Sequence, residues 1–229
     1  MGDVLSGGAT LQGVNVTHAE IHVPASGLWH LDVALQDSTE LTGPLSFVFQ
    51  SLTLTCAAVR SINYANSRGL RLVAGAGGWR QTIGPRQYAS PQAVMLSTVI
   101  GDAAQAVGEA TPVLASDVQL GTAYVRSQGP AVRVLDLLPL WWADFTGTVQ
   151  SKARDVSAIS SVFTLMNVDK SAGKAEIATN DLQDWTPGRT FSTPALSGTI
   201  NRVMHVIDHT QVRTYAFLPN LVAGEAVGS

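Results

Sequence analysis

The chain has 229 residues, a net charge of −3 at pH 7, a pI of about 5.9 and only 14% charged residues, whereas an ordinary soluble domain carries about 25%. A nucleic-acid-binding protein would show a basic stripe and a high pI, so we expect no specific binding of nucleic acid. No run approaches the roughly 18 apolar residues of a membrane-spanning helix, and the first ten residues lack the features of a signal peptide. We therefore expect synthesis in the cytoplasm and no insertion into a membrane.

The basic residues are eleven Arg and three Lys. Protein interfaces are enriched in Arg and depleted in Lys, because a guanidinium is less strongly hydrated than an ammonium and binds through a planar fork. The composition suits a subunit that buries surface against partners, and an ordinary neutral domain fits it equally well. The single cysteine, Cys56, excludes an internal disulfide, and its apolar surroundings predict a buried, inert thiol.

The first third of the chain alternates apolar and polar residues, as half-buried β-strands do. Four such runs are residues 14–23, 27–36, 44–59 and 69–75. In the first run, Ala19, Ile21 and Val23 share one face, and the polar residues between them share the other. These runs predict strands of one sheet.

The stretch near residues 91–108 predicts one regular helix. Ser90 can cap its start, Pro91 fits its first position, apolar residues follow at helical spacing, and Gly108 can end it. A second, shorter helix is predicted over residues 131–138, and the proline that follows would stop it.

Strand patterns resume after these helices and continue to the C-terminal region, with turns at Gly, Pro and Asn residues. We therefore expect a mainly β fold, built from β-barrel or sandwich domains with one or two helices. The Thr111-Pro112 break predicts an N-terminal β-barrel or sandwich domain over residues 1–110, which includes the helix, and a C-terminal β-rich domain over residues 111–229.

Trp141 and Trp142 are adjacent in a predicted strand, WWADF, in a chain with only five tryptophans. Neighbouring residues of a strand point to opposite faces, so the two indoles cannot both stack on one flat ligand. Trp141 shares its face with the apolar Ala143 and Phe145, which favours Trp141 as a core residue and Trp142 as a contact with another domain or subunit. A carbohydrate platform of Trp141 and Phe145 is the alternative.

Several stretches imitate catalytic or ligand-binding motifs. HAEIH, residues 18–22, lacks the glutamate beside the first histidine of the zinc-protease motif, and on a strand its two histidines lie about 13 Å apart. The glycine run at residues 74–84 predicts a loop, because no helix follows it to present its N-terminus to a pyrophosphate. We expect no catalytic residue, no metal site, no cofactor and no enzymatic activity.

Four segments in this order resemble baseplate hub proteins of bacteriophage tails. They are residues 72–90, 91–109, 124–149 and 184–220. The similarity spans roughly residues 65–220, and its most particular parts are the tryptophan pair leading into DFTGT and the Pro-Gly turn, strand and hairpin that end in VRTYAFL. The resemblance implies a β-barrel or sandwich subunit, commonly trimeric, that joins the tail tube to the central spike or tip. The chain is short for such a hub, so it is either a whole hub or one part of a split hub.

We therefore expect a structural protein of the virion, in a phage tail or baseplate, that acts by assembly as a homotrimer with tube and spike proteins as partners. The alternative is a carbohydrate- or cell-wall-binding β-module of a tail tip. The residues expected at interfaces are Trp142, Trp141, Trp79, Arg80 and Arg126.

Overall fold

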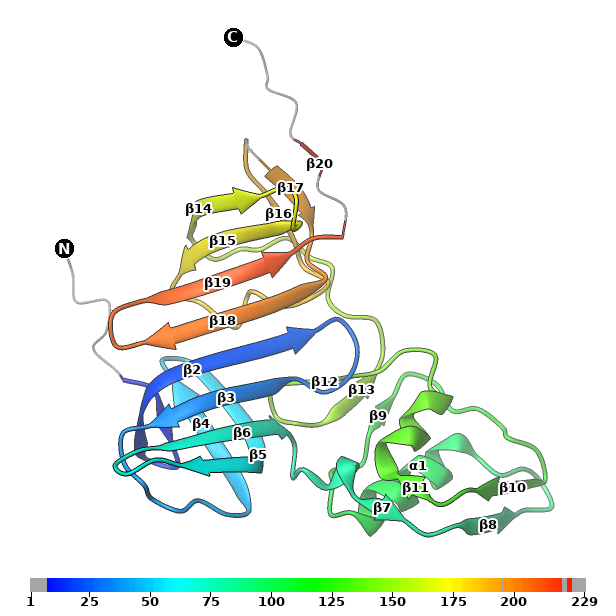
Figure 1. Cartoon of the computed structure of the whole chain (residues 1–229). Coiled ribbons are helices and arrows are strands. Elements are labelled where there is room, and N and C mark those ends of the chain that lie inside the picture. Colours follow the sequence, from blue (N-terminus) through cyan, green and yellow to red (C-terminus); the bar gives the residue numbers. More distant parts are fainter. Residues whose placement is uncertain (1–7, 195, 220–221, 224–229) are drawn as a thin grey trace.

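The computed structural model describes residues 8–194, 196–219 and 222–223, and its main feature is a ten-stranded antiparallel sheet (Figure 1). The strands lie in the order β1 (Thr10–Leu11), β4 (Pro44–Phe49), β5 (Leu52–Asn63), β6 (Arg68–Ala74), β3 (His30–Leu35), β2 (Val14–Pro24), β18 (Arg202–Asp208), β19 (Val212–Phe217), β15 (Lys174–Thr179) and β14 (Phe163–Asp169). Because β1 also pairs with β2, the first six strands of this order close into a barrel.

Strand β2 connects the barrel to the C-terminal strands. One of its edges pairs with β3. The other edge is shared, because β1 pairs with Val14 and Asn15, and β18 pairs with the segment from His18 to Pro24. Strands from both sides of residue 110 therefore share one sheet. The division into two domains at that residue stays a prediction.

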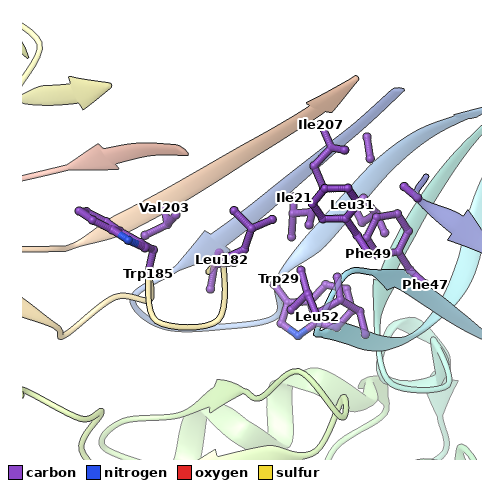
Figure 2. Close-up of a cluster of buried hydrophobic side chains, with 14 of the residues drawn as sticks. Ile21, Trp29, Leu31, Phe47, Phe49, Leu52, Leu182, Trp185, Val203 and Ile207 are labelled. Carbon is purple, nitrogen blue, oxygen red and sulfur yellow. The ribbon is translucent and has the colours of Figure 1, made fainter. Parts of the chain in front are cut away.

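The alternation read from the sequence determines which side chains form the interior. In β2, Ala19, Ile21 and Val23 are buried, as predicted. The first hydrophobic cluster joins the barrel to the C-terminal part of the chain, and Figure 2 shows members of both. They include Ile21, Trp29, Leu31, Phe47, Phe49, Leu52, Leu182, Trp185, Val203 and Ile207. Full burial of each large apolar side chain contributes about 1.5–3 kcal/mol, so this cluster holds the two parts together.

Residues 78–137, called the helical lobe below, lie beside the barrel in Figure 1. The lobe contains η1 (Gly78–Arg80), β7 (Thr82–Ile83), β8 (Arg86–Ala89), α1 (Leu96–Ala106), β9 (Val113–Leu114), β10 (Ala123–Arg126), β11 (Gly129–Pro130) and η2 (Ala131–Leu137). A second hydrophobic cluster forms its interior, and its members include Trp79, Val94, Leu96, Val99, Ile100, Ala103, Ala131, Leu135 and Leu138.

The mainly β fold, with one α-helix and two short 3-10 helices in the described residues, agrees with the fold class expected from the sequence. Helix α1, however, begins at Leu96 and not near residue 91. The N–H groups of Val94 and Leu96 donate to the carbonyl oxygens of Gly121 and Val118, so pairing with a distant loop replaces the first predicted turn. The second predicted helix is the short 3-10 helix η2.

Four small sheets complete the fold of the described residues. Two are the pairs β8–β10 and β7–β11 of the helical lobe. The other two consist of β12 (Trp142–Ala143), β13 (Val149–Ser151) and β9, and of β16 (Thr190–Ser192), β17 (Leu196–Thr199) and β20 (Val222–Ala223). In the described part of the chain, no helix has the length and apolar character needed to cross a membrane.

Candidate functional site

Trp141 and Trp142 lie near the connection between β2 and β3. Strand β12 contains only Trp142 and Ala143, so the WWADF strand is shorter than predicted. The carbonyl oxygen of Trp141 accepts hydrogen bonds from the Gly27 N–H (3.0 Å) and the Ser26 hydroxyl (2.8 Å). These bonds hold the tryptophan backbone against the barrel.

The Trp141 side chain is half-buried and packs against the second hydrophobic cluster. It lines a cleft of about 360 Å³ together with Trp29, His30, Arg71 and Arg80. The cleft therefore combines side chains of the barrel with one arginine of the helical lobe.

The Trp142 side chain is also half-buried, but it lies in different surroundings. Its Nε1 donates to the carbonyl oxygen of Lys152 (2.9 Å), and the guanidinium carbon of Arg154 lies 4.1 Å from the ring centroid. Arg154 also donates to the carbonyl oxygens of Pro24 and Ala25, both at 2.8 Å. Burial lowers the pKa of Arg154 to about 10, so the guanidinium stays charged at neutral pH and covers one face of the indole.

The sugar platform considered from the sequence requires Trp141 and Phe145 on one open surface. Phe145 packs against the first hydrophobic cluster, whereas Trp141 packs against the second. The two rings therefore lie in different surroundings. The assignment of Trp141 to the core and Trp142 to a subunit contact stays a prediction, since both indoles are partly accessible.

We expect Trp141→Ala to lower the free energy of unfolding by about 2–4 kcal/mol, because it removes a large side chain from the edge of a packed cluster. Trp142→Ala should cost only about 1–2 kcal/mol, because it removes one hydrogen bond and one cation–π contact. Urea denaturation measures both values. The exposed aromatic Tyr64 provides the control, since Tyr64→Ala should change stability by less than about 0.5 kcal/mol. A larger loss for Trp142 than for Trp141 would contradict this account.

The glycine run is a loop only in part, because it turns after β6 and continues into η1 and β7. The N–H groups of this turn surround a carboxylate of the same chain. Glu109, only 8% exposed, accepts hydrogen bonds from the N–H groups of Ala76 (3.0 Å), Gly78 (2.6 Å) and Trp79 (3.3 Å). A Cβ at Gly78 would clash with the carbonyl oxygen of Val107, so the close approach requires glycine. The loop is an anion-binding nest, and Glu109 is its anion.

Two of the residues expected at interfaces lie inside the molecule. Trp79 is 1% exposed within the second cluster. Arg126 is 7% exposed and donates to Asp102 (2.9 Å) and to the carbonyl oxygen of Gly84 (3.3 Å). Arg80 is exposed at the cleft beside Trp141. Among these three residues, only Arg80 presents its side chain to solvent.

Cys56 is fully buried, and burial raises the pKa of its thiol to about 12. The thiol therefore stays protonated at neutral pH, which confirms the inert cysteine predicted from the sequence.

The polar face of β2 and β3 brings together histidines and carboxylates from both strands. The register pairs His22 with His30 and Glu20 with Asp32. The two imidazole rings are stacked, with centroids 4.5 Å apart and planes inclined by 10°. Arg71 donates to both carboxylate oxygens of Asp32 at 2.7 Å, and these bonds lower the pKa of Asp32.

The HAEIH pattern places His18 and His22 along one strand and reveals nothing of the strand that follows. The signal was present, because only a short connection separates β2 from β3. A short connection makes the two strands an antiparallel hairpin and brings residues on either side of the turn into cross-strand pairs.

Comparison with known proteins gives matches to solved structures only, since no family model and no curated protein sequence matches the chain. The E. coli c3393 protein is described as a component of the type VI secretion system with structural similarity to T4 bacteriophage tail proteins gp27 and gp5. It matches with a TM-score of 0.61 and 11% identity, over 97% of this chain and 80% of that one.

Two tail proteins match to a similar degree. The 43 kDa tail protein of prophage MuSo2 from Shewanella oneidensis has a TM-score of 0.58 and 8% identity, over 96% of this chain and 99% of that one. The tail protein from Neisseria meningitidis MC58 has a TM-score of 0.59 and 10% identity, over 92% and 96%. The chain has the fold of these tail proteins. The likeness confirms, at the level of the fold, the resemblance found in the sequence.

Within this tail-protein fold, β14 forms an open edge of the large sheet (Figure 1). Among the described strands it pairs only with β15. Val162, just before the strand, is 92% exposed, and Met166 within it is 51% exposed. A groove of about 720 Å³ runs along this end of the sheet, lined by residues from 161 to 164, 178 to 181 and 210 to 213. An exposed strand edge with apolar side chains favours pairing with another chain.

Proposed function

We propose that this chain is a structural subunit of a phage tail or baseplate, and that it joins the tail tube to the spike or tip as a hub protein. The observation that supports the proposal most strongly is the tail-protein fold, which the three solved structures share over 92% or more of the chain. The low charge content and the predominance of Arg over Lys agree with a subunit that buries much of its surface. The site of action is then the virion.

The proposed role is structural and not enzymatic. Three buried reactive or charged groups already have structural partners or are inert: Glu109 binds the glycine loop, Arg126 pairs with Asp102, and Cys56 is a protonated thiol. Each of these groups stabilises the subunit and leaves no free nucleophile or base at its position. The partners proposed are further copies of the chain and the tube and spike proteins.

We propose that the β14 edge takes part in the assembly, as a homotrimer. Soluble proteins usually protect such an edge with charged residues or a β-bulge, or cover it. Strand β14 has a register shift between Leu165 and Asn167, but its exposed residues include Val162 and Met166. A neighbouring subunit that pairs with β14 would satisfy the open N–H and C=O groups of the strand and cover the apolar side chains.

The test is the mass of the purified protein in solution. We expect a trimer for the parent chain and a monomer for the double variant Val162→Lys/Met166→Lys, because lysines on an edge strand oppose edge-to-edge pairing. Ile62→Lys is the matched control, since Ile62 is 42% exposed on β5, away from this edge. It should remain trimeric.

A parent chain that stays monomeric at high concentration, or a double variant that still forms trimers, would contradict assembly through β14. Imaging of native particles tests the wider role, because a hub subunit must be found where the tube meets the spike. Tryptophan fluorescence that responds to cell-wall oligosaccharides would instead support the carbohydrate-binding module.

A further inference from the structure

Three potential metal ligands converge on the polar face of the β2–β3 hairpin. One ligand atom each from His22, His30 and Asp32 lies within 4.8 Å of the other two. All three residues are half-buried, so they are held by their strands and still reach solvent. The hairpin register fixes this placement, since His22 is directly opposite His30 and Asp32 is two positions further along β3.

The donors suit a borderline transition-metal ion. Zinc bonds imidazole nitrogen and carboxylate oxygen at about 2.0–2.2 Å in tetrahedral geometry, which places its ligand atoms about 3.3 Å apart. The present separations are at most 4.8 Å, up to about 1.5 Å more than that value, so side-chain rotations are needed to close the site. The stacked rings already point from neighbouring strands to one side of the sheet.

Neighbouring carboxylates favour the binding of a metal ion at these three residues. Glu20 Oε2 lies 3.5 Å from His22 Nε2, and metal-binding histidines are commonly oriented by such a carboxylate. With neutral imidazoles, Glu20 and Asp32 carry two negative charges, which attract a dication. Arg71, and Arg80 in the cleft beside His30, carry positive charges that oppose it.

We propose that His22, His30 and Asp32 form a binding site for one zinc ion or a similar transition-metal dication, with a fourth position open to water or to a residue of a partner chain. This proposal departs from the sequence-based expectation that the chain has no metal site, because that expectation considered each strand alone. The proposal does not depend on the function proposed above.

Arg71 is the competitor of the metal ion in this site. Its guanidinium occupies both oxygens of Asp32 and repels a cation, but its side chain is 49% exposed and is free to move aside. The Asp32 carboxylate then binds the ion through one oxygen and keeps Arg71 on the other. Removal of Arg71 should consequently strengthen metal binding, an effect that a purely structural ion pair would not produce.

The test is calorimetric titration of the full chain with zinc after treatment with EDTA, with the visible absorption of bound Co²⁺ as a second measurement. We expect one ion per chain. His22→Ala and His30→Ala should each weaken binding by about tenfold or more, since even residues that only orient metal ligands contribute that much. Arg71→Gln should strengthen binding by about fivefold or more.

His209→Ala is the matched control, because this histidine is exposed and lies outside the group of three. It should bind zinc like the parent chain. Melting temperatures measured without metal show whether each variant is folded. The absence of saturable zinc or cobalt binding by the parent chain, or binding that survives both His22→Ala and His30→Ala, would overturn the proposal.

Discussion

Replacement of Glu109 by alanine is expected to lower the free energy of unfolding by about 3–5 kcal/mol. The carboxylate accepts hydrogen bonds from three backbone N–H groups of the glycine loop, and the N–H groups of Gly78 and Trp79 lie in the interior. Without the acceptor these donors are left without partners, and each buried orphan costs about 1–3 kcal/mol. Urea denaturation followed by tryptophan fluorescence measures the loss, and the fluorescence should also change because Trp79 follows the loop.

Two further variants test whether the loss of stability comes from the Glu109 carboxylate. Glu109→Gln keeps the size of the side chain and one acceptor oxygen, so it should cost about half as much as Glu109→Ala. Glu40→Ala removes an exposed glutamate and should change stability by less than about 0.5 kcal/mol. If Glu109→Ala stayed within about 1 kcal/mol of the parent, the loop would be stable without its anion, contrary to our account.

Acidification is expected to destabilise the protein through His205, by about 5 kcal/mol once the pH has fallen to 3. His205 is fully buried on β18 with Nδ1 2.9 Å from the Thr214 hydroxyl, and burial lowers its pKa from 6.5 to about 3. The unfolded chain binds a proton at this histidine below pH 6.5, but the native protein does not. The stabilisation is therefore complete above pH 6.5 and is lost progressively as the pH falls toward 3.

The range from pH 6.5 to about 5 isolates this effect, because aspartates with lowered pKa values lose their contribution mainly below it. In that range the parent should lose about 1.5–2 kcal/mol. His205→Gln should be less stable at pH 7 but should show a much flatter pH dependence. The remaining slope belongs to groups such as His30, whose pKa burial also lowers. An equal slope in parent and variant would be evidence against the assignment to His205.

The local pattern of the sequence predicted the interior of the sheet well. Strict alternation in β2 predicted one face for Ala19, Ile21 and Val23 and the other face for the polar residues between them, and the structure buries the first set. A half-buried strand must separate its two faces, so this information is contained in neighbouring residues. The turn at the glycine run and the burial of Cys56 were also predictable from neighbouring residues. The run itself contains the glycines, and apolar residues lie within a few positions of Cys56.

Long-range pairing was not predictable in the same way. Helix α1 starts late because Val94 and Leu96 bond to a loop that the helical pattern does not reveal. The strand at Trp142 is short because a barrel loop and β13 fix its backbone from outside. The candidate metal site depends on the register of a hairpin, and the anion of the glycine loop comes from residue 109. Each of these features is set by a partner distant in the sequence or on another strand.

The shared edge of β2 also affects the order in which the chain folds during synthesis. The barrel strands come from the first third of the chain and can pair soon after they leave the ribosome. Strand β2, however, also pairs with β18, in the register Ile21 to His205, and β18 is synthesised near the end of the chain. During that interval the segment of β2 that pairs with β18, from His18 to Pro24, lacks its partner on a nascent, partly folded chain. Open strand edges favour aggregation. We therefore expect chains truncated before β18 to accumulate as aggregates, and the full-length protein to complete its fold only late in translation.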